Sequence, residues 1–229
     1  MKVIFLDIDN TLLDFDEYTK RTLKKGFEVF GLGKFDNHVL NVFHHENDIL
    51  WNRIEQGSLT FDELKKIRFN IIFSKLGVQF DGIRFETFYR DELHESAIFE
   101  KGALDMVEYL KKKYVLAVSS NGPYEQQLHR LSICGLDKYF SYFFISEGIG
   151  YSKPDTRFFL ESFRILNEGR SEKILPQETL ILGDSLTSDM KGGHDFGMHT
   201  CFYNKKGTQM VPQYIDYTID CLLQIKNFL

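Results

Sequence analysis

The chain has 229 residues, of which 43% are hydrophobic and 27% are charged, so it is long enough to bury an apolar core without disulfides or a structural metal. The formal net charge of -5 lacks the basic excess typical of proteins that bind nucleic acid polymers, and we expect no such partner. The first apolar run, residues 3–6, is too short for a membrane span or a signal peptide, and the 3 widely spaced cysteines indicate free thiols in a reducing cytoplasm.

The first predicted element is a buried strand over residues 3–6, and a long helical stretch follows it. Between about residue 15 and residue 95 no run is typical of a strand. One helix in this stretch begins after Thr60, because Thr60 and Glu63 have the spacing of a capping box, and it ends at Gly77. We therefore expect two domains, with the boundaries 1–14 and 96–229 for a core domain and 15–95 for an inserted helical domain.

The rest of the chain alternates between short apolar runs and amphipathic helical patterns. Further strands are predicted at residues 115–119, 143–146, 179–182 and 200–203. Helices are predicted at residues 103–113 and 157–166. The runs do not alternate between apolar and polar residues, as is typical of parallel strands covered on both faces. This order predicts an α/β fold in which helices connect the strands of a parallel sheet.

Polar residues follow the first four strands, Lys153 after a short loop, at the edge where ligands bind in open parallel sheets. They are, in chain order, Asp7 and Asp9, Ser120 and Asn121, Lys153, and Asp184 with Asp189. Each of these groups alone is more typical of a turn, a solvated lysine or a helix cap. Together they bring acids, a hydroxyl and an amine to one edge of one sheet. Because Mg2+ prefers oxygen ligands, this set predicts a phosphoryl-transfer site that uses Mg2+.

These residues resemble the four motifs of the haloacid dehalogenase superfamily of phosphatases, in order and in spacing. The segment 7–11 has the form D-x-D-x-T, Ser120 and Lys153 stand for the second and third motifs, and the segment 183–189 for the fourth. The resemblance implies a Rossmann-like parallel sheet core with a helical cap of the C1 type inserted after the first strand. Further segments are similar to the bacterial pyrimidine 5'-nucleotidase branch, namely residues 51–64, 119–122, 152–155 and 204–207.

The resemblance also implies chemical roles for the two acids of the first motif. Asp7 would attack phosphorus and form an aspartyl-phosphate, and Asp9 would act first as general acid and then as general base. Magnesium would be bound by Asp7, by the main-chain carbonyl of Asp9 and by Asp184, with Asp189 supporting these ligands. The implied reaction is hydrolysis of a phosphate monoester.

The remaining motif residues are expected to bind the substrate. Ser120, Asn121 and Lys153 would bind the phosphoryl oxygens. By the resemblance, the substrate would be a small phosphate ester, namely a nucleoside 5'-monophosphate with a preference for pyrimidine bases. By the same resemblance, Asn10 and Thr11 shape the loop and do not take part in the chemistry.

Other activities of the superfamily stay open at the level of sequence. A sugar-phosphate phosphatase and a mutase of the β-phosphoglucomutase type would use the same groups. A haloacid dehalogenase shares the nucleophile but has no use for Asp9. A phosphonatase would need a lysine in the cap, for which Lys65 and Lys66 are candidates.

Three other side chains of the inserted segment are interpreted as structural. His44 and His45 are adjacent in sequence, so they cannot share one face of a helix and do not predict a metal site. Trp51 could stack on a base, but a tryptophan within an apolar helix is more often part of a core.

Overall fold

The computed structural model describes residues 1–205, 207 and 210–229, and it divides the chain into two compact units. The core unit consists of Met1–Phe15 and Ala97–Leu229. The inserted unit consists of Asp16–Ser96. Lys206, which belongs to the segment 204–207 that is similar to the nucleotidase branch, lies outside the described residues.

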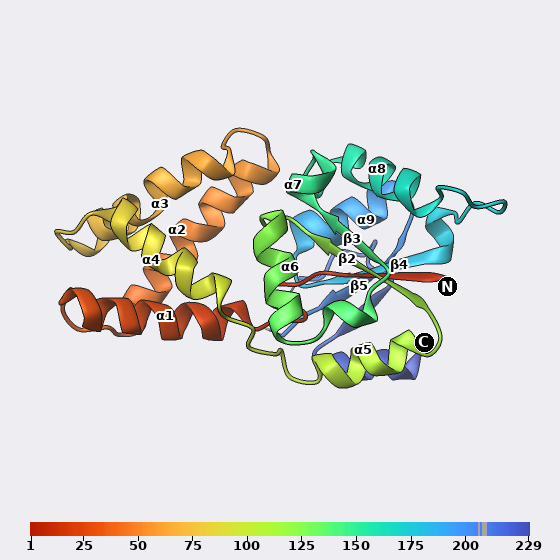
Figure 1. Cartoon of the computed structure of the whole chain (residues 1–229), viewed down its shortest axis with the longest axis horizontal. Helices are drawn as coiled ribbons and strands as arrows, with labels where there is room; N and C mark the ends of the chain where they lie inside the picture. The colour runs from red at the N-terminus through yellow and green to blue at the C-terminus, as the bar shows by residue number, and fades with distance from the viewer. Residues whose placement is uncertain (206, 208–209) are drawn as a thin grey trace. The chain divides into compact units, whose positions relative to one another are not determined.

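A six-stranded parallel sheet forms the centre of the core unit (Figure 1). Its strands are β1 (Val3–Leu6), β2 (Val115–Ser120), β3 (Tyr142–Ile145), β4 (Thr179–Gly183), β5 (His199–Tyr203) and β6 (Tyr217–Ile219). Their order across the sheet is β3-β2-β1-β4-β5-β6, and every neighbouring pair is parallel. This sheet confirms the predicted α/β fold.

The helices of the core unit lie between these strands in the sequence, except η4, which follows the last strand. They are α5 (Ala103–Lys111), α6 (Tyr124–Ile133), η1 (Asp137–Tyr139), α7 (Ser146–Ile149), α8 (Thr156–Leu166), η2 (Pro176–Glu178), η3 (Leu186–Met190), α9 (Lys191–Phe196) and η4 (Leu222–Asn227). Alternate residues of β1 enter different apolar clusters, Ile4 and Leu6 with residues of α5, α6 and η4, and Val3 and Phe5 with residues of α8 and η3. Both faces of the sheet are therefore buried at β1, as its uninterrupted apolar run predicts.

Strand β6 was not predicted. It is short, and of its residues only Ile219 is buried. The pattern over Tyr217–Ile219 therefore contains no apolar run that would distinguish it from a loop. The other strands differ from their predicted bounds by at most one residue at either end.

Helices dominate the inserted unit. They are α1 (Phe15–Phe30), α2 (Asn37–Glu55), α3 (Phe61–Leu76) and α4 (Gly82–His94). The predicted start of α3 is confirmed, because the Thr60 hydroxyl accepts a hydrogen bond from the Glu63 N–H at 3.2 Å and the Glu63 carboxylate accepts one from the Thr60 N–H at 2.8 Å. The helix ends at Gly77, whose φ of 68° is left-handed and suits glycine.

The core of the inserted unit is aromatic and also contains a buried ion pair. Rings pack at short centroid distances, for example 4.6 Å between Phe69 and Phe85. The guanidinium of Arg68 donates to both carboxylate oxygens of Glu86, at 2.9 and 2.6 Å, and both side chains are only 4% exposed. The sequence pattern did not predict a charged residue on the buried face of α3, because arginine is rarely buried without a partner. Here the partner comes from α4.

The two segments that connect the core unit to the insertion are paired with each other inside the core unit. Residues 12–14 run antiparallel to residues 98–100, with a bridge between Leu13 and Phe99. The Asp14 N–H donates to the Ile98 carbonyl at 2.8 Å, and the Glu100 N–H donates to the Leu12 carbonyl at 3.0 Å. The ammonium of Lys205 lies 3.0 Å from the Asp14 carboxylate and 2.6 Å from that of Glu100, so it braces both segments.

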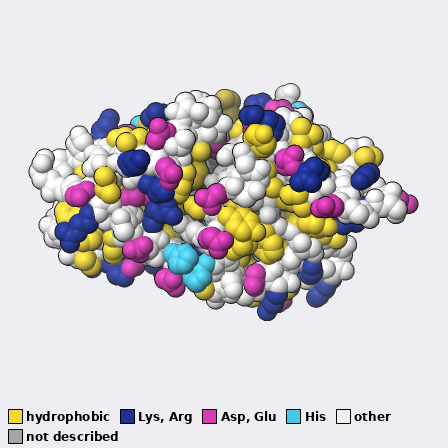
Figure 2. Space-filling view, turned by 45° about the horizontal axis from the view of Figure 1, so that its top comes forward, with side chains coloured by type: hydrophobic (Ala, Val, Ile, Leu, Met, Phe, Trp, Pro, Cys, Tyr) yellow, Lys and Arg dark blue, Asp and Glu magenta, His cyan; other side chains and the backbone are white. Residues whose placement is uncertain are grey.

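The surface is mixed in charge. On the face drawn in Figure 2, Lys and Arg side chains lie among Asp and Glu side chains. This mixture agrees with the small net charge of -5. Among the residues that the structure describes, none of the helices is both long and apolar enough to cross a membrane.

Candidate active site

The carboxyl edge of the sheet brings the predicted acids together. Strand β1 lies between β2 and β4, so Asp7, which follows β1, neighbours the end of β2 and the residue Asp184 that follows β4. Asp189 reaches the same place from η3. Carboxylate oxygens of Asp7, Asp184 and Asp189 all lie within 4.8 Å of one another. The structure thus joins residues that are more than 170 positions apart in a single acidic cluster.

Lys153 is buried against two of these three acids, and its side chain is only 1% exposed. Its ammonium donates to the Asp7 carboxylate at 2.9 Å, to the Asp189 carboxylate at 2.5 Å and to the Ser119 carbonyl at 2.7 Å. These three bonds use all three hydrogens of the ammonium group. A ligand that binds Lys153 must therefore replace one of these acceptors.

Asn121 holds the segment that carries this lysine. The Asn121 amide donates to the Lys153 carbonyl at 2.9 Å and accepts from the Lys153 N–H at 2.8 Å. The side chain of Asn121 is therefore occupied by the main chain of residue 153. The group of Asn121 that suits phosphate is its backbone N–H.

The charges of the cluster do not balance. Burial raises the pKa of Asp7 well above its usual value, the ammonium of Lys153 opposes this shift, and the carboxylates of Asp189 and Asp184 add to it. Burial alone would lower the pKa of Lys153, but the carboxylates of Asp189 and Asp7 raise it. With all groups ionised, three carboxylates face one ammonium, and the site has two negative charges in excess. A divalent cation that prefers oxygen ligands fits both the donor set and this charge.

Glycine is required where β4 ends. A Cβ atom on Gly183 would lie 2.1 Å from a carboxylate oxygen of Asp189. The Asp189 carboxylate also accepts a hydrogen bond from the Ser185 N–H at 3.3 Å, and the Ser185 hydroxyl accepts one from the Ser188 N–H at 3.1 Å. Ser185 therefore caps the start of η3, and its N–H also holds the Asp189 carboxylate.

The hydroxyl of Ser120 is oriented to donate a hydrogen bond. Its hydroxyl oxygen accepts hydrogen bonds from the Gly122 N–H at 3.2 Å and from the Gln127 amide at 2.9 Å. A hydroxyl has two acceptor positions and one donor hydrogen, so these two bonds leave the hydrogen for a further acceptor. This arrangement suits an anionic oxygen.

Asp9 is held by two residues that the sequence analysis missed. Its Oδ1 accepts from Arg130 at 2.7 Å and its Oδ2 accepts from Gln127 at 2.9 Å. Both partners come from α6, the helix that follows Ser120. Their spacing of three residues, which places them on one face of that helix, was the signal that could have indicated them.

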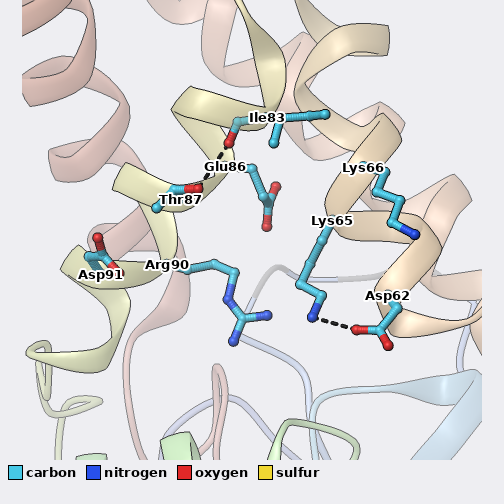
Figure 3. A pocket seen from close by; sticks show the side chains of 8 residues that line it. All are labelled: Asp62, Lys65, Lys66, Ile83, Glu86, Thr87, Arg90 and Asp91. Atoms are coloured by element: carbon cyan, nitrogen blue, oxygen red, sulfur yellow. Dashed lines mark hydrogen bonds and ion pairs between the residues drawn. The ribbon is translucent and has the colours of Figure 1, made fainter.

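The candidate residues of the inserted unit have structural contacts. A cavity of about 410 Å3 lies between α3 and α4, and Figure 3 shows Lys65, Glu86 and Arg90 pointing into it. Lys65 is paired with Asp62 at 2.5 Å, and Lys66 is exposed. Schiff-base chemistry is favoured by a desolvated lysine, so neither lysine supports the phosphonatase alternative.

Trp51 packs as expected for a core residue. Its ring lies 5.9 Å from that of Phe61, and both contact the apolar cluster of Leu50, Leu59 and Leu64. This packing gives the indole a structural role within the inserted unit.

Comparison with known proteins identifies the class of this enzyme. A family model described as haloacid dehalogenase-like hydrolase matches residues 1–197. The HAD-hydrolase YfnB of Bacillus subtilis is 32% identical over 214 residues, which cover 93% of this chain and 88% of YfnB. The chain belongs to the haloacid dehalogenase-like hydrolases and is a hydrolytic enzyme of that family.

Two pyrimidine 5'-nucleotidases and one crystal structure are also similar to this chain. The pyrimidine 5'-nucleotidase PynA of Streptococcus pneumoniae is 32% identical over 230 residues, covering 96% of this chain and 94% of PynA. The pyrimidine 5'-nucleotidase YjjG of Escherichia coli is 28% identical, covering 88% and 85%. The crystal structure of YfnB bound to magnesium superposes with a TM-score of 0.87 at 31% identity, covering 100% of this chain and 98% of that one.

Proposed function

We propose that this protein is a magnesium-dependent phosphomonoester hydrolase that acts through an aspartyl-phosphate, with pyrimidine nucleoside 5'-monophosphates as its preferred substrates. The observation that carries the proposal is the geometry around Asp7. A buried carboxylate lies beside two further carboxylates and an ammonium, and the neighbouring hydroxyl of Ser120 has its hydrogen free for an anion.

The metal ligands proposed are the Asp7 carboxylate, the Asp9 main-chain carbonyl and the Asp184 carboxylate, with Asp189 supporting them through Lys153 and Ser185. When bound, Mg2+ would compensate the excess negative charge of the cluster and allow an anionic phosphate to approach. The YfnB crystal structure is bound to magnesium, which supports the choice of metal.

In the first step an oxygen of Asp7 attacks phosphorus, and the bond between phosphorus and the ester oxygen breaks. Asp9 donates its proton to the departing alkoxide. Lys153, Ser120 and the Asn121 N–H donate hydrogen bonds to the phosphoryl oxygens, whose charge is redistributed in the transition state. In the second step Asp9 accepts a proton from water and the water oxygen bonds to phosphorus. The bond between phosphorus and the Asp7 oxygen breaks, which regenerates the Asp7 carboxylate and releases inorganic phosphate.

The inserted unit is proposed to act as the cap, with domain boundaries 1–14 and 96–229 for the core and 15–95 for the cap. Movement of a cap would admit a small ester and then exclude solvent from the aspartyl-phosphate. The interdomain movement described for the YfnB crystal structure supports this assignment.

The pyrimidine preference rests on the similarity to PynA and YjjG. A second candidate is a sugar-phosphate phosphatase, since a glyceraldehyde 3-phosphate phosphatase of Pyrococcus furiosus is 26% identical over 242 residues. The deciding experiment measures kcat/KM with Mg2+ for UMP, dUMP and TMP beside purine nucleotides and triose and hexose phosphates. A large advantage for a sugar phosphate would refute the nucleotidase assignment and keep the phosphatase.

The covalent mechanism has its own test. Asp7→Asn should abolish turnover, because the amide retains the size of the side chain but not its nucleophilic charge. Substantial phosphatase activity in the folded variant would refute the aspartyl-phosphate.

A further inference from the structure

We infer that Gln127 and Arg130 of α6 are positioning residues that fix the carboxylate of Asp9 and couple it to the hydroxyl of Ser120. The inference rests on the proposed function, because it concerns the proton transfer assigned there to Asp9. Neither residue belongs to the four motifs from which the site was predicted.

Both oxygens of the Asp9 carboxylate are held by separate donors. Arg130 donates to Oδ1 at 2.7 Å and Gln127 donates to Oδ2 at 2.9 Å. The two donors are themselves 1% exposed, whereas the Asp9 side chain is 33% exposed. A rotation of the carboxylate would break both bonds and leave a guanidinium buried without this partner. The exposed part of the Asp9 carboxylate is therefore held in one orientation.

Gln127 connects this carboxylate to the phosphate-binding hydroxyl. Its Nε2 donates both to Asp9 Oδ2 and to Ser120 Oγ, each at 2.9 Å. Its Oε1 accepts from Arg130 at 2.8 Å, which fixes which end of the amide faces Asp9. One amide group therefore orients the proposed proton donor and also leaves the Ser120 hydrogen available for an anion.

The backbone is adapted to this glutamine. A Cβ atom on Gly122 would lie 2.5 Å from Gln127 Nε2. Glycine at position 122 thus allows the amide to pass close to the main chain and reach Asp9 and Ser120 together. The Asn-Gly pair at residues 121–122, which the sequence alone explains as a turn, also has this packing function.

The expected signature follows from what Asp9 is proposed to do. An alkoxide leaving group, as in UMP, depends on protonation much more than an activated aryloxide such as p-nitrophenolate. Loss of the orientation of Asp9 should therefore reduce hydrolysis of UMP more than hydrolysis of p-nitrophenyl phosphate. A general loss of structure would reduce both to the same extent.

The experiment measures kcat/KM for both substrates in Arg130→Met, Arg130→Lys and Gln127→Ala. We expect Arg130→Met and Gln127→Ala to lose at least tenfold more activity on UMP than on p-nitrophenyl phosphate, and Arg130→Lys to recover part of the difference. Arg164→Met, which removes an exposed arginine from α8, is the matched control and should resemble the wild type. In an Asp9→Asn background the same substitutions should not change the ratio between the substrates further.

Equal losses on both substrates, or an additional change of the ratio in the Asp9→Asn background, would overturn the inference. If Arg130→Met does not fold, as judged by circular dichroism, the ratio in Gln127→Ala decides, because that variant removes no charge. A wild-type protein that hydrolyses neither substrate would overturn the proposed function itself, which is a different result from an unchanged ratio.

Discussion

Burial of the Asp7 carboxylate, the proposed nucleophile, lowers the stability of the folded protein at neutral pH when no metal is bound. Burial raises its pKa well above the usual value, and Asp189 and Asp184 add to the shift although Lys153 opposes it. The folded protein without metal therefore binds a proton at Asp7 more readily than the unfolded chain does. The contribution of this proton to the free energy of unfolding is fully present below the pKa of Asp7 in the unfolded chain, about 3.9. It is lost as the pH rises through the pKa of Asp7 in the folded protein.

Asp7→Asn should consequently raise the Tm of the metal-free protein at pH 7 to 8, because the amide carries no charge in either state. For a chain of this length, about 1 kcal/mol corresponds to about 2–4 °C. The advantage over the wild type should shrink as the pH falls and should be lost below about 3.9, where Asp7 binds its proton in the unfolded chain as well. Thermal unfolding in EDTA across this pH range measures the effect, and a variant less stable than the wild type at every pH would contradict it.

At the residue scale the sequence predicted the groups that follow the strands and missed those that hold them. Asp7, Ser120 and Asp184 stand directly at the ends of apolar runs, so their convergence follows from the parallel sheet alone. Gln127 and Arg130 lie within an ordinary amphipathic helix, where a glutamine and an arginine are normally solvated. Their burial, with both residues 1% exposed, and their hydrogen bonds to Asp9 distinguish them from surface residues.

Helix α3 offers a simple test at the scale of a single element. Thr60→Ala removes the hydroxyl that accepts from the Glu63 N–H, and the helix start then lacks this side-chain acceptor. We expect a loss of about 1 kcal/mol, as is typical for a helix cap, with no change in kcat. Urea unfolding and steady-state kinetics measure the two quantities. Thr60→Ser, which keeps the hydroxyl, is the matched control and should stay close to the wild type.

The ion pair between Arg68 of α3 and Glu86 of α4 should contribute more to the stability of the inserted unit than the helix cap at Thr60 does. Glu86→Gln would leave the Arg68 guanidinium buried without its carboxylate, and breaking a buried pair in this way costs about 3–5 kcal/mol. The double variant Arg68→Met with Glu86→Leu should recover most of this loss, because neither charge then remains. Denaturant unfolding of the single and double variants would contradict the expectation if they were equally unstable.

Elements differed in how well the sequence predicted them. The limits of α3 were predictable because the capping box and Gly77 mark both ends with specific residues. Its buried face was predicted incompletely, since the pairing of Arg68 with Glu86 depends on a second helix that begins at Gly82. Strand β6 depends in the same way on its neighbour β5, because its own residues have no apolar pattern.

For the whole molecule, the excess of carboxylates predicts a large response to Mg2+. A ligand that binds only the folded state stabilises it by about 2.7 kcal/mol at 100 times its Kd. We expect the Tm of the wild type to rise with Mg2+ concentration, and the increase to be weak in Asp184→Ala, which lacks one anionic ligand. Thermal scans with and without Mg2+ measure this increase, and equal increases in both proteins would exclude Asp184 as a ligand.

The antiparallel pairing of residues 12–14 with residues 98–100 has a consequence for how such a chain can change over evolutionary time. Because the two connecting segments are hydrogen-bonded to each other, the residues between them form one insertion whose two ends are fixed next to each other. The entropy of closing a loop grows only with the logarithm of its length, so a doubling costs about 0.6 kcal/mol. Segments of very different size and sequence could therefore be exchanged at this point while the strands and their acidic edge persist. The junction makes the host fold a stable platform on which new specificities can be grafted.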